Sequence, residues 1–244
     1  MKVVIVTPAP NFSTSYVTSL VETLHHAQTF NVEIIFHTRS GSNINELRNI
    51  MAQDMYEHPG EKPDKIFWID SDISWLVADF VKILASPFRI TCGAYMLNPD
   101  GDLSVAVQHQ STDRMLPYSI KDVPNLKEYE QIFASGFGFI CMDFDVLEEI
   151  GLGCFAPLPL SEELDNTIPH FCMSEDTAFC MRAKRAKIPV MWDTEVLLGH
   201  EKSTVWFPSG CDESTRTVGL NTMRTVSGWH KVLNQEENNS DETD

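Results

Sequence analysis

The sequence has few basic residues, no long apolar run and no paired cysteine motif. Its 18 Lys and Arg residues stand against 35 Asp and Glu residues, which gives a formal net charge of −17. Such a surface does not attract polyanions, so neither nucleic acid nor an anionic membrane is expected as the main partner. No apolar run approaches the roughly 18 residues that a membrane-spanning helix needs. We therefore expect no transmembrane segment.

The cysteines are scattered, and none of them belongs to a Cys-x-x-Cys pair. Several have apolar neighbours, which favours reduced thiols in a core over disulfides. The sequence also lacks a basic segment followed by an apolar one at its start, the pattern typical of a secretory leader. These features predict a cytoplasmic protein. The six cysteines are Cys92, Cys141, Cys154, Cys172, Cys180 and Cys211.

The length and composition predict one domain with a short tail. With 244 residues, of which 43% are hydrophobic, the chain can bury a sizeable core. We expect this domain to span residues 1–234. Residues 235–244 are polar and acidic, a composition typical of disorder, and are expected to form a tail.

The first half of the chain alternates strand and helix patterns. Continuous apolar runs predict strands at 3–6, 32–37, 65–69 and 90–96. The expected helices between them are 14–29, 43–58 and 76–84, the first with an apolar stripe formed by Val17, Leu20, Val21 and Leu24. This order predicts an α/β fold with a mostly parallel central sheet flanked by helices.

The second half is less regular. Residues 98–125 alternate only loosely and predict a hairpin or an extended excursion beside the sheet. A glycine-punctuated apolar run at 132–142 predicts one further strand, and residues 152–174 predict a long loop of a kind that is often functional. The other expected elements are helices at 143–151, 174–187 and 213–233 and a strand at 190–192.

Two aspartates follow directly on the apolar run at 65–69. A strand there delivers Asp70 and Asp72 to the carboxyl end of the sheet, the edge where open α/β sheets bind ligands. Two carboxylates within one turn form a hard oxygen site suited to Mg²⁺ or Mn²⁺, and such an ion can hold a diphosphate. The alternative is an acidic turn that only precedes the next helix.

Four parts of the chain together resemble a known family. They are Ile69-Asp70-Ser71-Asp72, the glycine-rich run at 135–142, Ser174-Glu175-Asp176 and Gly199-His200. In this order and spacing they resemble the nucleotide-sugar-dependent glycosyltransferases of the GT-A fold, and the resemblance covers residues 1–205. It implies a single Rossmann-like GT-A domain, a divalent ion and a nucleotide-sugar donor. The acceptor would be a hydroxyl of a glycan, lipid or protein.

The resemblance also implies roles for individual residues. Asp72 would bind the metal, Asp70 the metal or the donor ribose, and His200 would complete the metal site. Glu175 and Asp176 would lie near the acceptor, with Asp176 as general base in an inverting enzyme. These residue types suit the reaction, because a divalent ion can neutralise the departing nucleoside diphosphate and a carboxylate can take the acceptor proton.

Further residues are candidates for donor binding because of their position or charge. Thr7 and Pro8 close the first strand at the ligand-binding edge, and Ser71 lies between the two aspartates. Arg48 and Lys202 could bind phosphate, since cations are scarce in this chain. The alternatives are a simple turn, a solvated helix arginine and a surface lysine.

Two other functions stay open. A sugar nucleotidyltransferase also uses paired acids and a divalent ion, but it typically carries a glycine-rich basic loop after its first strand. This chain has Thr7-Pro8-Ala9-Pro10-Asn11 at that position, with no basic residue. A non-catalytic nucleotide-sugar-binding module would keep the metal acids without needing Asp176.

Overall fold

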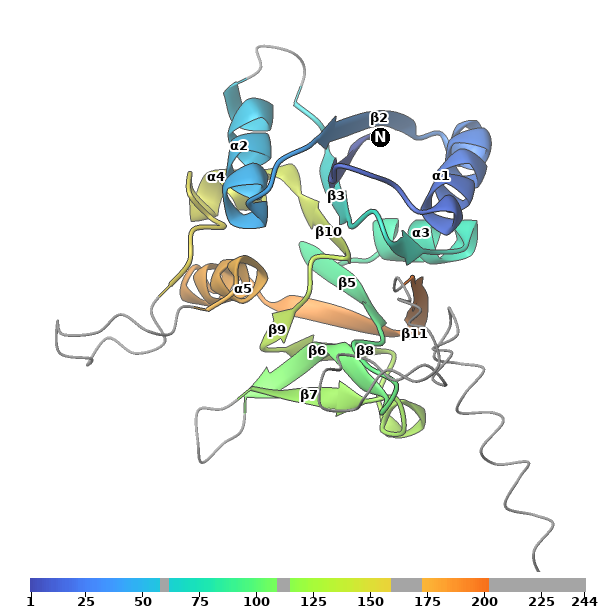
Figure 1. Ribbon diagram of the computed structural model, residues 1–244, viewed down its shortest axis with the longest axis vertical. Helices are drawn as coiled ribbons and strands as arrows, with labels where there is room; N and C mark the ends of the chain where they lie inside the picture. The colour runs from blue at the N-terminus through green and yellow to red at the C-terminus, as the bar shows by residue number, and fades with distance from the viewer. Residues whose placement is uncertain (58–61, 109–114, 159–172, 202–244) are drawn as a thin grey trace, which may run out of the picture.

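The computed structural model describes residues 1–57, 62–108, 115–158 and 173–201. These residues form a central sheet with helices on both faces and a smaller sheet beside it (Figure 1). The α/β fold class predicted from the sequence is confirmed. Within the described ranges, every helix is too short or too polar to cross a membrane. The helix expected at 213–233 and the tail at 235–244 lie outside them.

Eight strands form the central sheet. They are β1 (Lys2–Pro8), β2 (Glu33–Arg39), β3 (Lys65–Ile69), β4 (Ile73–Ser74), β5 (Ile90–Tyr95), β8 (Tyr129–Ile132), β10 (Phe139–Asp143) and β11 (Val190–His200). Their order is β2-β1-β3-β10-β5-β11-β4, and β8 pairs with β11. β1 pairs in parallel with β2 and β3, and β5 pairs in parallel with β11. β10 lies antiparallel between β3 and β5, so the parallel strands end at one common edge.

The glycine-punctuated run does not form one strand. It is divided among β8, β9 (Ala134–Ser135) and β10, and β9 belongs to the small sheet. The prediction of one strand at 132–142 is wrong, because Gly136-Phe137-Gly138 carries the chain from the small sheet into the central one. The small sheet has the order β7-β6-β9 and contains the antiparallel pair β6 (Asp102–Gln108) and β7 (Met115–Ser119). This pair confirms the hairpin expected within 98–125.

Helices cover both faces of the central sheet (Figure 1). They are α1 (Thr14–Ala27) and α3 (Val77–Leu84) on one side and α2 (Ile44–Glu57), α4 (Phe144–Ile150) and α5 (Glu175–Arg185) on the other, with short 3₁₀ turns at Gln28–Phe30 and Val123–Asn125. β3 alternates between the two cores, as the period of two in a strand requires. Ile66 and Trp68 join the core under α2 and α5, whereas Phe67 and Ile69 join the core under α1 and α3.

Helix α1 packs through a different face from the one expected. Val17, Val21 and Leu24 of the predicted apolar stripe are exposed. The buried face instead contains Ser19, whose hydroxyl donates to the carbonyl of Trp75 at 2.8 Å and accepts from its N–H at 3.0 Å. The stripe prediction is therefore wrong for three of its four residues, because hydrogen bonding allows a polar side chain to be buried.

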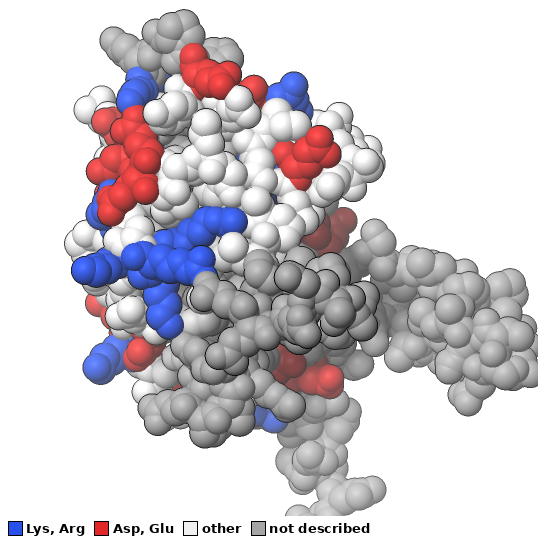
Figure 2. Space-filling model, turned by 90° about the vertical axis from the view of Figure 1, so that its left-hand side faces the viewer, with Lys and Arg blue, Asp and Glu red and all other residues white. Residues whose placement is uncertain are grey.

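Helix α5 carries opposite charges at its two ends. Glu175 and Asp176 lie in its first turn, and Arg182, Lys184 and Arg185 lie in its last turn. Both groups match the helix dipole, which favours anions at the N-terminus and cations at the C-terminus. Basic side chains gather on the face of the molecule that carries α5 (Figure 2). The acidic end of the helix faces the candidate site described below.

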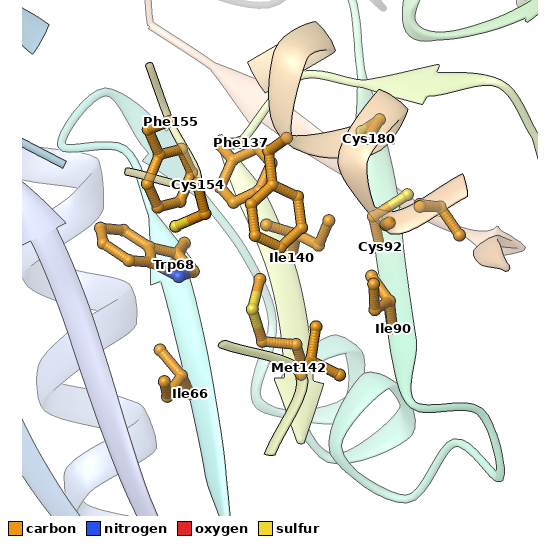
Figure 3. Packing of buried hydrophobic residues seen from close by; sticks show 14 of the residues in the cluster. Ile66, Trp68, Ile90, Cys92, Phe137, Ile140, Met142, Cys154, Phe155 and Cys180 are labelled. Atoms are coloured by element: carbon orange, nitrogen blue, oxygen red, sulfur yellow. The ribbon is translucent and has the colours of Figure 1, made fainter. Parts of the chain in front are cut away.

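An aromatic cluster supports the start of α5 and the end of β3. Trp68, Phe137, Phe155 and Phe179 are almost wholly buried, and Figure 3 shows three of them, Trp68, Phe137 and Phe155, beside one another. The ring centroid of Phe155 lies 5.0 Å from those of Trp68 and Phe137 and 5.1 Å from that of Phe179. Phe155 therefore joins three separate parts of the chain through one side chain.

We predict that Phe155→Ala lowers the free energy of unfolding by about 3–5 kcal/mol, because it leaves a cavity among three rings. Guanidinium unfolding followed by circular dichroism measures the loss. Leu152→Ala is the matched control, since Leu152 lies in the same loop with 62% of its surface exposed. It should change stability by less than about 0.5 kcal/mol. Equal effects of the two changes would contradict the supporting role of Phe155.

Candidate functional site

A cavity of about 300 Å³ opens at the carboxyl edge of the central sheet. Its walls come from the ends of β1, β3 and β5, from α2, from the glycine-rich segment before β10 and from the start of α5. The lining residues are Pro8, Ile44, Arg48, Asp70, Ser71, Asp72, Tyr95, Phe137, Glu175 and Asp176. This is the edge where open α/β sheets bind their ligands.

Most of the residues that the sequence nominated as site residues meet in this cavity. Pro8, Arg48, Asp70, Ser71, Asp72, Glu175 and Asp176 line it. Thr7 does not, because its side chain is fully buried and its hydroxyl is hydrogen-bonded to that of Tyr16. Its carbonyl accepts a hydrogen bond from the Thr38 hydroxyl at 2.9 Å. Lys202 lies outside the described residues.

Arg48 connects the two acidic parts of the cavity. Its Nη2 donates to Asp70 Oδ1 at 2.6 Å, and its Nη1 donates to Glu175 Oε1 at 2.8 Å. The guanidinium lies over the ring of Phe137, 5.3 Å from the centroid, and its side chain is only 3% exposed. The sequence suggested a phosphate contact for this arginine. Its charge instead faces two carboxylates of the protein itself.

Burial and charge act against each other at this contact. Burial alone would lower the pKa of Arg48, but Asp70 and Glu175 raise it above its ordinary value. Burial raises the pKa of Glu175, which Arg48 opposes and Asp176 reinforces. Removal of one partner of such a buried pair leaves the other charge uncompensated. Arg48 therefore stabilises the ionised form of Glu175 in the cavity wall.

Asp72 and His200 form the second polar contact. His200 lies at the end of β11, and its Nδ1 donates to the carbonyl of Met96 at 2.8 Å, since a carbonyl oxygen can only accept. Its Nε2 lies 3.2 Å from Asp72 Oδ2. With Nδ1 donating to Met96, the second ring nitrogen Nε2 is turned toward the Asp72 carboxylate, the arrangement of a histidine whose free nitrogen can bind a metal ion.

The main chain holds Asp72 beside β11. The N–H of Glu201 donates to the Asp72 carbonyl at 2.8 Å, and β4 pairs with the end of β11. Among the residues that the structure describes, no group of three or more His, Cys, Asp or Glu side chains is placed to hold a metal ion. Asp72 and His200 are thus brought together, while Asp70 is paired with Arg48.

Asp176 also lines the cavity, at the start of α5. Its Oδ1 accepts from the N–H of Thr177 at 2.7 Å and from the hydroxyl of Ser174, the residue that precedes α5. These bonds fix one carboxylate oxygen at a helix N-terminus. The carboxylate is half-buried and faces the same cavity as Asp72.

The sequence did not identify three of the cavity residues. Ile44, Tyr95 and Phe137 supply its apolar walls. Tyr95 ends β5 at the ligand-binding edge, and this position at the end of an expected strand could have identified it as a site residue. Phe137 lies between Gly136 and Gly138, which pack against Tyr95 in the fold, and the sequence does not indicate this contact. Ile44 gives no signal of its own, because an apolar residue at a helix start is common.

We predict that Arg48→Met destabilises the fold by about 3 kcal/mol, because it leaves Glu175 and Asp70 without their cation. The loss of Arg48 lets burial raise the pKa of Glu175 further above its unfolded value. A raised folded-state pKa contributes stability at low pH that is lost as the pH rises through that pKa. The deficit should therefore shrink when unfolding is measured at about pH 5 instead of about pH 8.

The control for this change is Arg39→Met. Arg39 pairs with Asp54 at 2.6 Å, but both side chains are well exposed, at 47% and 33%. Loss of an exposed pair should cost at most about 1 kcal/mol. A pH-independent deficit in Arg48→Met would contradict the electrostatic role of Arg48.

Comparison with known proteins gives structural neighbours only. No protein-family model matches the chain, and no curated protein matches its sequence. GalNAc-T7, solved with UDP, GalNAc and Mn²⁺, is similar with a TM-score of 0.51 and 11% identity. The match covers 82% of this chain and 43% of GalNAc-T7, so the chain spans less than half of that protein's length.

Two further neighbours have lower scores. The catalytic domain of Drosophila β1,4-galactosyltransferase 7, solved with xylobiose, has a TM-score of 0.47 and 13% identity, with 83% of this chain and 71% of that chain covered. The inositol-1-phosphate CTP transferase of T. maritima has a TM-score of 0.40 and 12% identity, with 79% and 85% covered. At 11% identity, the likeness to GalNAc-T7 establishes a GT-A-like fold and leaves the activity to be argued from this chain's own site.

Proposed function

We propose that this protein is a metal-dependent glycosyltransferase that moves a sugar from a nucleotide-sugar donor to an acceptor hydroxyl. The arrangement of one cavity carries the proposal. Asp72, paired with His200, and Asp176, at the start of α5, line the same cavity. A transferase needs both functions in one pocket, because the leaving diphosphate and the attacking hydroxyl both act at the anomeric carbon of the sugar.

The Asp72 and His200 pair fits a divalent ion. Its donor atoms are a carboxylate oxygen and an imidazole nitrogen, a set that suits Mn²⁺ and is acceptable for Mg²⁺. The Met96 carbonyl fixes the ring with Nε2 toward Asp72, the usual outer support of a metal-binding histidine. A bound ion would neutralise charge on the departing nucleoside diphosphate. Asp70, held by Arg48, would contact the ion or the donor ribose.

The charge of the cavity supports the need for an ion. Among the described residues that line it, Asp70, Asp72, Glu175 and Asp176 carry four negative charges and Arg48 carries one positive charge. The formal net charge of these side chains is −3, and the positive charge is already engaged by two acids. A diphosphate would be repelled from such a pocket without a cation.

Asp176 is the proposed general base. Its carboxylate faces the cavity from a helix N-terminus, where it can take the proton of an acceptor hydroxyl as that hydroxyl attacks. Ser174 and the Thr177 N–H hold one of its oxygens in place. In a retaining enzyme the same group would position the acceptor instead. The acceptor itself would be a glycan, a lipid or a protein.

A test of the proposal is donor turnover. The protein is incubated with UDP- and GDP-sugars and Mn²⁺, and nucleoside diphosphate release is measured with and without chelator. Slow metal-dependent release supports a transferase. Release of pyrophosphate from a nucleoside triphosphate and a sugar phosphate would indicate a nucleotidyltransferase. Binding of a nucleotide sugar without any release, with or without added acceptors, would indicate a binding module.

We predict that Asp72→Asn abolishes Mn²⁺-dependent binding of UDP or GDP, because the amide keeps the volume of the side chain but lacks its charge. Titration calorimetry with Mn²⁺ present measures this loss. Asp100→Asn is the control, since Asp100 lies in an exposed turn away from the cavity. Equal nucleotide affinity in Asp72→Asn and the parent protein would remove Asp72 from the metal site.

We predict that Asp176→Asn separates binding from turnover. If Asp176 takes the acceptor proton, the change should lower the transfer rate by roughly 10²–10⁴-fold and leave donor affinity unchanged. Both quantities are measured on the same preparation, with an acceptor identified by screening. Full turnover in the variant would exclude the general base, and a loss of donor affinity would place Asp176 among the donor-binding groups.

A further inference from the structure

The side chain of Tyr95 forms part of the wall of this cavity. It ends β5, next to the strand that carries His200, and its ring meets the His200 ring edge to face at 4.8 Å between centroids. It lines the same cavity as Asp72 and Asp176. Although the residue is only 7% exposed, it therefore borders the cavity that the proposed metal ligand Asp72 and the proposed base Asp176 also line.

Two glycines make room for this ring. A Cβ atom on Gly136 would lie 2.3 Å from the Tyr95 phenol oxygen, and a Cβ on Gly138 would lie 2.5 Å from a carbon of its ring. Any side chain at either position would displace the tyrosine. The two glycines therefore fix where the Tyr95 ring lies in the wall of the cavity.

The phenol group has no partner of its own in the described protein. Its ring is packed, and its main-chain N–H is bonded to Ser104, but none of the described residues forms a hydrogen bond with its hydroxyl. A tyrosine hydroxyl carries its proton at neutral pH, since the ordinary pKa of a phenol is about 10. A hydrogen-bond donor is therefore available at the cavity wall, and polar groups in such places normally have a partner.

We propose that the Tyr95 hydroxyl hydrogen-bonds a hydroxyl of the sugar being transferred and so contributes to the choice of sugar. This inference rests on the proposed function. If the diphosphate binds beside Asp72 and His200 and the acceptor loses its proton to Asp176, the sugar must lie in the cavity that these acids share, and Tyr95 lines that cavity. Tyr95 is then a specificity-determining residue that contacts the sugar but neither the metal nor the nucleotide.

Tyr95→Phe tests the proposal, because it keeps the ring that packs on His200 and removes only the hydroxyl. In the presence of Mn²⁺, affinity is measured by calorimetry for UDP-glucose, GDP-mannose and the matching diphosphates UDP and GDP. The variant should bind the nucleotide sugar that the parent binds about 3- to 10-fold more weakly, the effect of one lost hydrogen bond. Its affinity for the matching diphosphate should not change. Tyr118→Phe is the control, since Tyr118 packs on Trp192 away from the cavity.

Gly136→Ala gives an independent test of the same contact. The new methyl group would displace the phenol oxygen and should weaken nucleotide-sugar binding in the parent. In the Tyr95→Phe background that oxygen is absent, and the nearest atom becomes the ring carbon Cζ at 3.3 Å. The second change should then have little further effect, a non-additivity expected only for groups in contact. Fully additive losses would overturn the proposal.

The other outcomes separate this inference from the proposed function. If Tyr95→Phe weakens the sugar and the free diphosphate equally, the tyrosine acts through His200 and the sugar contact is wrong. Unchanged affinity for both ligands also overturns the contact, while the transferase proposal stands. If the parent protein binds Mn²⁺ but none of the nucleotide sugars, the proposed function fails, and the role of Tyr95 fails with it.

Discussion

The contact of Arg48 with Asp70 and Glu175 is the interaction on which the site depends. It joins the end of β3 to the start of α5, two segments separated by more than a hundred residues in the sequence, through bonds of 2.6 and 2.8 Å. The guanidinium is buried against Phe137, whereas the side chains of Glu175 and Asp70 are 12% and 29% exposed. The ammonium group of a lysine is a compact charge without the planar fork of a guanidinium, so a lysine would not bind both carboxylates in one plane. Arg48 therefore links the two segments that carry the proposed metal ligand and the proposed base.

The sheet topology explains why the remaining groups meet at the same place. Because β1, β3, β5 and β11 run in the same direction, Pro8, Asp70, Tyr95 and His200 all lie at one edge. β10 runs the opposite way between β3 and β5, so the segment that precedes it begins at that edge. Phe137 and its glycines thus enter the cavity beside the strand ends. The insertion of one antiparallel strand adds an aromatic wall that a fully parallel sheet would not have.

The sequence predicted the parts of the site that local patterns encode. Asp70 and Asp72 follow an apolar strand, and Glu175 and Asp176 open a helix, so each pair could be placed from its own neighbours. The pairing of Arg48 with Asp70 and Glu175 could not be predicted, because the residues around a helix arginine do not indicate that it will be buried between acids distant in the sequence. The division of this run into separate strands at Gly136 and Gly138 could not be predicted either, since the apolar residues on both sides of the glycines read as one continuous strand. On α1, hydropathy favoured Val17 over Ser19, although hydrogen bonds to Trp75 bury the serine.

The charge distribution links the fold to the order of events in the site. Arg48 is engaged by two carboxylates, so its charge stabilises the protein and gives no net attraction to an anionic ligand. The basic residues of α5 lie in its last turn, at the other end of the helix from the cavity. A negatively charged donor therefore meets a pocket whose described lining residues have a formal net charge of −3. On the proposed function, a divalent ion beside Asp72 and His200 has to bind before or together with the donor, because only that ion turns the repulsion into attraction.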